Sequence, residues 1–175
     1  MARAEGGRDA GVSSSTYPRA LRPAELLETL RRHAVEFVVI GGFALAPHGY
    51  VRATKDLDIV PEPSPENLGH LACALRELDA HVDLGDIGAD ELGQMPDEEG
   101  LSAGGNWVLQ TKFGRLDVMQ DVPGLRDFKR LRGGAMEVGD VPYAGYDELI
   151  SMKAASGREE DLRDIGALEI ARGTD

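Results

Sequence analysis

The sequence has a single cysteine and few aromatic residues. Cys73 has no second cysteine to pair with among these 175 residues, so an intrachain disulfide and a zinc site built from several cysteines are both excluded. Because it falls within a helical leucine pattern, Cys73 is predicted to be a core residue. Aromatic residues make up 5% of the chain. The one tryptophan, Trp107, is predicted to lie in the core or in a partly buried strand, and not to stack on a base.

Basic residues are fewer than acidic residues in this chain. The chain holds 19 Lys and Arg residues against 31 Asp and Glu residues, which gives a net charge of −12. This balance argues against a broad basic surface that holds nucleic acid by its phosphates. It leaves room for a local basic cleft, for which Arg52, Lys55 and Arg115 are candidates. Lys112 is interpreted as an ordinary solvated charge.

Long apolar runs are missing as well. No segment approaches the length needed to span a bilayer, and the N-terminal MARAEGGRDA contains no apolar signal region. We therefore expect no membrane association and a cytoplasmic location. Residues 1–18 are rich in Gly, Ala and Ser and are expected to form a disordered tail. Residues 19–175 are expected to form one domain, since 42% hydrophobic content supports a real core.

The chain does contain clear helix and strand patterns, which predict an α/β (α+β) fold. Helices are expected from Pro23 to about residue 34 and over 43–49, 65–78, 147–156 and 159–172. Strands are expected over 36–40, 56–60, 107–111, 115–120 and 136–141. The stretch 82–105, with its acidic cluster at 97–99, is predicted to be a solvated loop. The last two helices are expected to form a C-terminal helical pair.

The most informative stretch begins with a buried apolar strand, Phe37–Ile40, that runs into Gly41 and Gly42. Between a strand end and a helix start, glycine lets backbone N–H groups approach a phosphate because no Cβ stands in the way. The alternative is a tight strand-to-helix turn that binds no ligand.

Asp56 and Asp58 follow in the next strand. Side chains alternate across a strand, so these two carboxylates point to one face while Leu57 and Ile59 point to the other. Two parallel carboxylates repel each other unless a hard cation such as Mg²⁺ or Mn²⁺ lies between them, and such a cation commonly bridges to substrate phosphates. Asp117, in a later strand, is the candidate for a third carboxylate. The alternative is a turn cap and two aspartates on a solvated surface.

The order of these motifs resembles the signature of the nucleotidyltransferase superfamily, matched here by Ile40-Gly41-Gly42 and Asp56-Leu57-Asp58. The resemblance implies the DNA polymerase beta-like fold, in which a small mixed sheet is flanked by helices and followed by a C-terminal helical pair. It also implies transfer of a nucleoside monophosphate from an NTP to an acceptor, with release of pyrophosphate. The implied cofactor is Mg²⁺ or Mn²⁺. The implied catalytic and metal-binding residues are Asp56, Asp58 and Asp117. The implied nucleotide-binding residues are Gly41, Gly42, Arg52 and Lys153.

The C-terminal stretch resembles the ending of small nucleotidyltransferase-like proteins, a group that includes toxins of the AbiEii type. These commonly show a Lys, then Gly-Arg, then Asp-Leu-x-Asp, matched here by Lys153, Gly157-Arg158 and Asp161-Leu162-Arg163-Asp164. Glu160 departs from the pattern, which has a basic residue at that place. Pro47, inside the short helix after the glycines, is a second departure.

Several of these residues have structural interpretations that the sequence leaves open. Lys153 is predicted either to neutralise a nucleotide phosphate or to pair with Glu148, Asp161 or Asp164. Arg158 is predicted to pair with Asp161 at a helix junction. His48 is close enough to the glycines to reach a nucleotide, but a structural role is favoured.

The sequence does not identify the acceptor, which is expected to be tRNA, another protein or a small molecule. One alternative function is that of an antibiotic nucleotidyltransferase. Another is a non-catalytic nucleotide-binding partner in a toxin–antitoxin pair, which implies a cognate partner protein.

Overall fold

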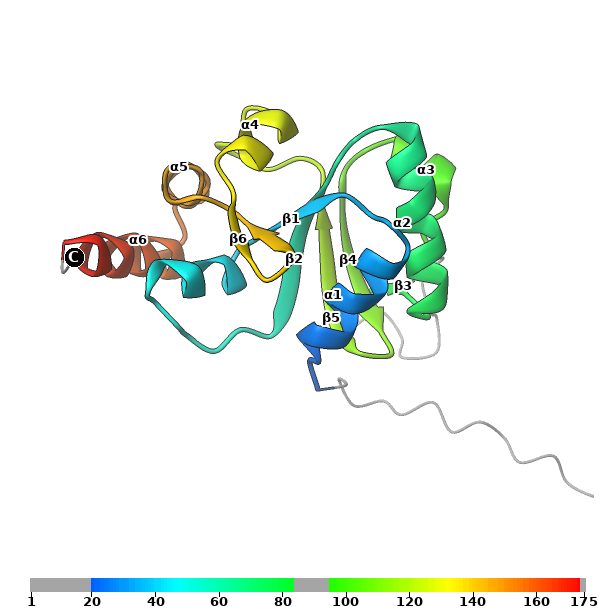
Figure 1. The fold of residues 1–175 in the computed structure, drawn as a ribbon, viewed down its shortest axis with the longest axis horizontal. Coiled ribbons are helices and arrows are strands. Elements are labelled where there is room, and N and C mark those ends of the chain that lie inside the picture. The colour runs from blue at the N-terminus through cyan, green and yellow to red at the C-terminus, as the bar shows by residue number, and fades with distance from the viewer. Residues whose placement is uncertain (1–19, 84–94, 174–175) are drawn as a thin grey trace, which may run out of the picture.

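The chain folds around a seven-stranded mixed sheet that has helices on both faces (Figure 1). The computed structural model describes residues 20–83 and 95–173. The tail expected over residues 1–18 lies outside the described residues, as do residues 84–94 of the acidic segment. The expected architecture, a small mixed sheet flanked by helices with a C-terminal helical pair, is confirmed.

The helices and strands follow one another as the sequence patterns indicate, with some additions. The helices are α1 (Pro23–Arg32), the 3₁₀ helix η1 (Phe43–His48), α2 (Pro65–Glu77), α3 (Glu98–Ser102), α4 (Phe128–Gly133), α5 (Tyr146–Ser156) and α6 (Glu159–Arg172). The strands are β1 (Phe37–Ile40), β2 (Asp56–Pro61), β3 (His81–Val82), β4 (Asn106–Thr111), β5 (Gly114–Met119), β6 (Met136–Val138) and β7 (Val141–Tyr143). No described helix is both long enough and apolar enough to cross a membrane.

The strand order β3-β4-β5-β2-β1-β7-β6 determines where the sequence motifs meet. Strand β2 pairs antiparallel with β1, so that Ile40 lies opposite Asp58. It pairs parallel with β5, so that Asp58 lies beside Asp117. The end of β1 and the first halves of β2 and β5 therefore meet in one region of the sheet. The turn at Gly41 and Gly42 leads out of the sheet at this place.

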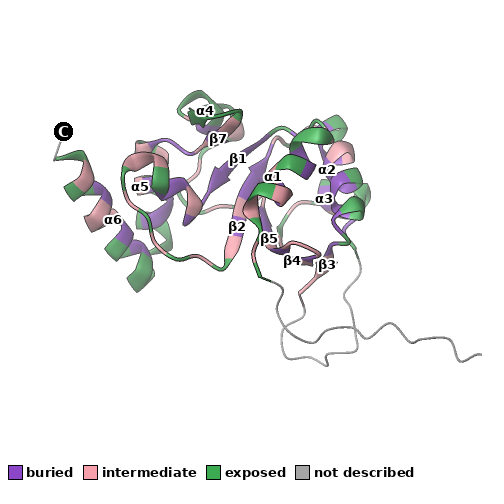
Figure 2. Cartoon of the chain, turned by 60° about the horizontal axis from the view of Figure 1, so that its bottom comes forward, coloured by how far each residue is buried: buried purple, intermediate pink, exposed green. Residues whose placement is uncertain are grey.

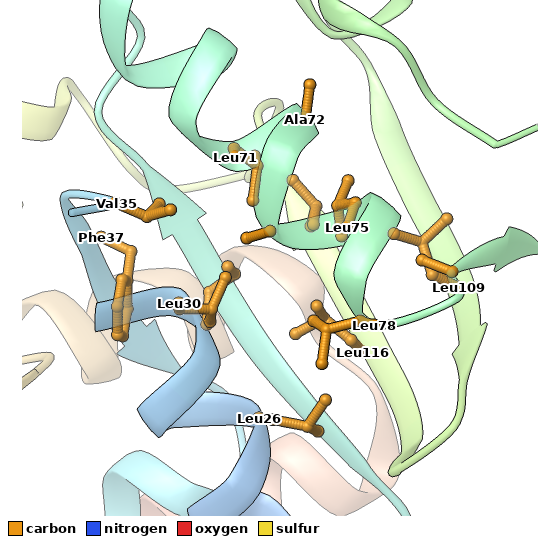
Figure 3. Packing of buried hydrophobic residues seen from close by; sticks show 14 of the residues in the cluster. Leu26, Leu30, Val35, Phe37, Leu71, Ala72, Leu75, Leu78, Leu109 and Leu116 are labelled. Atoms are coloured by element: carbon orange, nitrogen blue, oxygen red, sulfur yellow. The ribbon is translucent and has the colours of Figure 1, made fainter. Parts of the chain in front are cut away.

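Two apolar layers hold the helices against the two faces of the sheet. On one face, leucines of α1 and α2 pack on Leu57, Ile59 and Leu116 (Figure 3). On the other face, Leu149 of α5 and Leu168 of α6 belong to a second cluster with β1. Burying this apolar surface is the main favourable term in folding. Figure 2 shows the resulting pattern, with buried residues on the strands and exposed residues on the outer sides of the helices.

Local signals explain where the main helices begin and end. Ser64 caps α2 by accepting a hydrogen bond from the backbone N–H of Asn67, and Pro65 occupies the first turn, where its missing N–H costs nothing. Helix α5 ends at Gly157, whose φ of +65° is a left-handed conformation that glycine adopts without strain. That turn leads into α6, which packs against α5.

The structure corrects three expectations about local structure. The acidic cluster is not all loop, because Asp97 accepts a hydrogen bond from Gly100 and begins the short helix α3. Helix α4 was not predicted, although Asp127 provides the same kind of cap. The strand expected over 136–141 is a hairpin, β6 and β7, that turns at Gly139.

Cys73 is exposed, so the prediction that it is a core residue is wrong. The buried face of α2 contains Leu68, Leu71 and Leu75, whereas Cys73 lies on the side of Arg76, whose guanidinium is 3.6 Å from the sulfur. Trp107 is a partly buried residue of β4, as predicted.

Candidate functional site

A cleft of about 550 Å³ lies over the place where β1, β2 and β5 meet. Its walls come from the Gly41–Gly42 turn, from the loop that leads into β2, and from the end of α5 and the start of α6. The C-terminal helical pair thus forms one side of the cleft and the sheet forms its floor.

Three aspartates share the floor of this cleft. Asp56 lies beside Arg115, and Asp58 beside Asp117, in the parallel ladder between β2 and β5. Register partners in neighbouring strands point to the same face of a sheet, and so do residues two apart in one strand. Asp56, Asp58, Asp117 and Arg115 all line the cleft. The structure therefore brings together the three carboxylates that the sequence singled out.

Two of the three carboxylates have clear hydrogen-bond partners. Thr54 donates a hydrogen bond to Asp56, with 3.1 Å between Oγ1 and Oδ1. Arg115 donates two hydrogen bonds to Asp117, each of 2.9 Å, from Nε to Oδ1 and from Nη2 to Oδ2. The same Nε lies 3.8 Å from Oδ2 of Asp56. Asp58 differs from both, because no described residue donates a hydrogen bond to its carboxylate or forms an ion pair with it.

The environment of Asp58 disfavours its negative charge. Burial, together with the negative charges of Asp56 and Asp117, raises the pKa of Asp58 to about 7, and the positive charges of Arg115 and Lys153 offset this only in part. A carboxylate in such surroundings is stabilised by any cation that can reach it.

These residues fit a divalent cation in their chemistry. Carboxylate oxygens are the ligands that Mg²⁺ and Mn²⁺ prefer, and Asp58 is a carboxylate without a cationic partner in the described structure. The present side-chain positions are less favourable. Within residues 20–83 and 95–173, no three His, Cys, Asp or Glu side chains lie close enough together to hold a metal ion. Arg115 donates its hydrogen bonds to Asp117, so the Asp117 carboxylate becomes free for another ligand only when the Arg115 side chain moves away.

The two glycines of the turn have different neighbours. Gly41 has a φ of +65°, and a Cβ added there would come within 2.1 Å of Oδ2 of Asp58. A Cβ at Gly42 would lie 3.0 Å from Oγ1 of Thr54 and 3.4 Å from Nη1 of Arg52. Glycine is thus required at position 41, whereas a side chain at position 42 would need the Thr54 side chain to shift by a few tenths of an ångström. The N–H groups of Gly41 and Gly42 form no hydrogen bond with the backbone of another described residue; Gly41 is partly buried and Gly42 is buried.

Arg52 and Lys153 line the cleft but are held by buried carboxylates. Arg52 donates two hydrogen bonds to Asp164, of 2.9 and 3.0 Å. Lys153 donates to the same carboxylate at 2.7 Å and to Asp161 at 3.2 Å. The side chains of Lys153, Asp161 and Asp164 are buried, and that of Asp164 is fully buried. The hydrogen bonds from Arg52 and Lys153 overcome the effect of desolvation and lower the pKa of Asp164.

Of the three carboxylates predicted as partners of Lys153, Asp161 and Asp164 pair with it, whereas Glu148 pairs with Arg130. The contact of Lys153 with a nucleotide phosphate stays a prediction. The predicted ion pair between Arg158 and Asp161 is confirmed, with 2.7 Å between Nε and Oδ2.

His48 forms a hydrogen bond of 2.9 Å with the carbonyl oxygen of Ala144 and an edge contact with the ring of Tyr146. Both contacts support the structural interpretation of this residue.

Lys55 has a distinct place among the basic residues of the cleft. Five cationic side chains line the cleft: Arg52, Lys55, Arg115, Lys153 and Arg158. Of these five, Lys55 alone forms no ion pair with a described residue. It is exposed in the loop that leads into β2. The partners of Arg52 and Arg115 were not predicted from the sequence. For Arg115 the sequence does contain an indication, because residues two apart in a strand, such as Arg115 and Asp117, point to the same face of the sheet.

No protein-family model matches the sequence, and no curated protein matches it. Among solved structures, the fold is similar to that of the antibiotic-resistance factor ANT(2'')-Ia in solution, with a TM-score of 0.48 and 12% identity over 86% of this chain and 87% of that chain. It is also similar to the crystal structure of ANT(2'')-Ia in complex with adenylyl-2''-tobramycin, with a TM-score of 0.46 and 12% identity over 86% and 92% of the two chains. At these values, any function of the chain has to be argued from its own site.

Proposed function

We propose that this chain is a nucleotidyltransferase that moves a nucleoside monophosphate from an NTP to an acceptor hydroxyl. The acceptor oxygen forms a new bond to the α-phosphorus, and the bond from that phosphorus to the oxygen bridging the α- and β-phosphates breaks. Pyrophosphate leaves with the bond electrons, and the proton of the hydroxyl passes to a carboxylate of the site and then to solvent.

One observation carries this proposal. Asp56, Asp58 and Asp117 lie on the same face of adjacent strands, at the floor of a cleft whose wall is the Gly41–Gly42 turn. The arrangement places hard oxygen ligands beside backbone N–H groups that have no backbone acceptor among the described residues. A triphosphate needs both, since its charge is stabilised by cations and its oxygens accept hydrogen bonds.

Each residue has a separate task in this proposal. Asp56 and Asp58 would hold Mg²⁺ or Mn²⁺, which neutralises the charge that develops on the phosphates. Asp117 orients the acceptor hydroxyl and takes its proton. The N–H groups of Gly41 and Gly42 bind the β- and γ-phosphates. Most of the rate enhancement comes from positioning and from electrostatic stabilisation in a prearranged cleft.

The basic residues divide into two groups. Lys55, which has no ion pair in the described structure, is proposed to contact the triphosphate directly. Arg52 and Lys153 are proposed to act on the nucleotide chiefly through Asp164. Their hydrogen bonds to that carboxylate fix α6 and the loop before β2 as walls of the cleft.

The acceptor is proposed to be a small molecule or a protein in preference to tRNA. The net charge of −12 and the ion pairs of four of the five cleft cations leave little basic surface for a nucleic acid backbone. The second candidate function is nucleotide binding without transfer, and the observation that favours it is the Arg115–Asp117 pair, which occupies the proposed proton acceptor.

Incubation with NTPs tests the proposal. The full chain is mixed with Mg²⁺, a cell extract and each NTP, labelled either at the α- or at the γ-phosphate. Transfer moves the α-label into a macromolecular or small-molecule fraction and leaves the γ-label in pyrophosphate. Asp58→Asn is the inactive control. Binding of a non-hydrolysable NTP without transfer of either label would favour the binding function, and no binding at all would contradict both.

A further inference from the structure

The guanidinium of Arg115 lies among the three carboxylates of the proposed site. It makes two hydrogen bonds of 2.9 Å to Asp117, and its Nε is 3.8 Å from a carboxylate oxygen of Asp56. One nitrogen thus lies between carboxylates that belong to two different strands. The contact follows from the sheet itself, because Arg115 is the register partner of Asp56 and lies two residues before Asp117 on the same face.

Arg115 is the cation that neutralises these carboxylates directly. The other buried cation nearby, Lys153, donates to Asp161 and Asp164, and Arg158 donates to Asp161. Within the described residues, only Arg115 forms an ion pair with any of Asp56, Asp58 and Asp117. Three carboxylates with one guanidinium leave negative charge uncompensated, and Asp58 forms no ion pair with any described residue.

A guanidinium and a divalent cation cannot share this place without cost. A metal ion held by Asp56 and Asp58 would lie close to the Arg115 guanidinium, whose Nε is 3.8 Å from the Asp56 carboxylate, and two cations at such a distance repel each other strongly. The present geometry agrees with this, since no three carboxylates of the described chain are arranged for a metal ion while Arg115 is paired. The side chain of Arg115 is 36% exposed and reaches the cleft, so it has room to turn away.

We propose that Arg115 is the built-in counter-ion of the carboxylate site, which a divalent cation replaces and which then binds the phosphates of the nucleotide. This inference rests on the proposed function and adds a positioning residue to it. In the metal-free protein, Arg115 keeps Asp56 and Asp117 from repelling each other. When metal and NTP enter together, the released guanidinium faces the triphosphate, whose oxygens match its planar pair of donors. The site therefore binds metal weakly alone and firmly with nucleotide.

Binding of Mn²⁺ to Arg115→Met tests this exchange without any measure of activity. Methionine keeps much of the aliphatic side chain and removes the charge. In titration calorimetry without nucleotide, Arg115→Met is expected to bind Mn²⁺ at least about tenfold more tightly than the unaltered protein. With Mg²⁺ present, its affinity for a non-hydrolysable NTP is expected to fall at least about fivefold. Arg132→Met, which removes an exposed ion pair with Glu137 outside the cleft, is the matched control and is expected to change neither value.

Two outcomes would overturn the inference. Equal Mn²⁺ affinity in Arg115→Met and the unaltered protein would show that Arg115 does not compete with metal. Tighter Mn²⁺ binding with undiminished NTP affinity would show that the released guanidinium does not meet the phosphates. Both results are separate from the proposed function, because transfer of label by the unaltered protein is measured independently.

A measurement on the unaltered protein covers the case in which Arg115→Met does not fold. The arginine Nε–H signals are followed by NMR, and the Arg115 signal is assigned by its loss in Arg115→Lys. Addition of Mg²⁺ with a non-hydrolysable NTP is expected to shift this signal, as the hydrogen bond to Asp117 is exchanged for one to phosphate. A signal that stays in place while nucleotide binds would overturn the inference.

Discussion

Asp58 and Asp117 are register partners in the parallel ladder between β2 and β5, and they face the same cleft. Their strands are separated by the 52 residues of positions 62–113, yet the sheet places them side by side. The two carboxylates differ in their partners, because Asp117 is paired with Arg115 whereas Asp58 forms no ion pair with any described residue. This difference makes Asp58 the more sensitive position for testing metal binding.

Asp58→Asn is expected to abolish tight binding of Mn²⁺ in the presence of a non-hydrolysable NTP. The amide keeps the shape of the side chain but removes the charge and one of the metal-binding oxygens. Calorimetry with Mn²⁺ and the nucleotide measures the effect, which is expected to exceed tenfold in apparent affinity. Asp121→Asn, an exposed position outside the cleft, is the control. Equal Mn²⁺ binding by Asp58→Asn would show that Asp58 is not a ligand.

The same variant is expected to be more stable than the unaltered protein when metal is absent. Because the pKa of Asp58 is raised to about 7 in the folded state, the folded protein holds a proton that the unfolded chain releases near pH 4. The free energy of unfolding therefore falls progressively as the pH rises from about 4 to about 7, because the folded state must either keep the proton on Asp58 or bear its disfavoured charge. Asp58→Asn removes this cost, so its gain in Tm in EDTA should be small at pH 4 and at least about 4 °C at pH 8.

Thermal unfolding at several pH values in EDTA checks the sign of this effect. A gain in Tm that is the same at pH 4 and at pH 8 would mean that the carboxylate is not the source. Addition of Mg²⁺ and nucleotide should reverse the order of stability, because only the unaltered protein then gains a ligand.

The sequence predicted the local parts of the site because they depend on local rules. The alternation of Asp56, Leu57 and Asp58 defines a strand with a polar face, and glycine after a buried strand indicates a sharp turn. Both features need only the geometry of neighbouring residues. The C-terminal helical pair followed from the periodic pattern of apolar residues, whereas the mixed sheet was implied by the resemblance to nucleotidyltransferases.

The partner of Arg52 could not be predicted in this way. Arg52 meets Asp164 across 112 positions of sequence, and no local rule fixes which carboxylate a long flexible side chain reaches. The exposure of Cys73 was missed because a helix buries only one stripe, and a residue between two leucines can lie outside it. Short capped helices such as α3 and α4 gave little periodic signal over so few residues.

Gly41→Ala is expected to lower the free energy of unfolding by at least about 2–3 kcal/mol. Alanine at a φ of +65° is strained, and its Cβ would lie 2.1 Å from the Asp58 carboxylate, so that carboxylate must move. Gly139→Ala is the matched control. Gly139 has a φ of +61° but nothing within 4 Å of an added Cβ, so only the backbone cost of about 1 kcal/mol applies. Urea denaturation measures both variants, and equal losses would show that Asp58 does not restrict the turn.

Asp164→Asn is expected to cost about 3–5 kcal/mol of stability. The change keeps the size of the side chain, but it leaves Lys153 buried and both Lys153 and Arg52 without their shared carboxylate. Arg163→Ala, which removes an exposed ion pair with Glu159 on the same helix, should cost less than about 1 kcal/mol. Comparable losses for the two variants in urea denaturation would mean that the buried cluster does not stabilise the packing of α6.

Asp117→Asn is expected to abolish transfer while nucleotide binding is largely retained. In the proposed reaction, Asp117 serves the acceptor hydroxyl, whereas Asp56, Asp58 and the glycine turn serve the triphosphate. An amide cannot take the proton of the acceptor, and loss of a general base lowers the rate by about 10²–10⁴-fold. The affinity for a non-hydrolysable NTP with Mg²⁺, measured by calorimetry, should change by less than about threefold, because most contacts to the phosphates remain.

The outcome separates the two functions considered for this cleft. Full transfer activity in Asp117→Asn would remove Asp117 from the chemistry and leave a site of two aspartates. Absence of transfer in both proteins, with nucleotide bound equally by both, is the result that a non-catalytic nucleotide binder requires. Loss of transfer in the variant alone, with nucleotide still bound, is the result that requires Asp117 to act on the acceptor, as its position beside Asp58 in the ladder predicts.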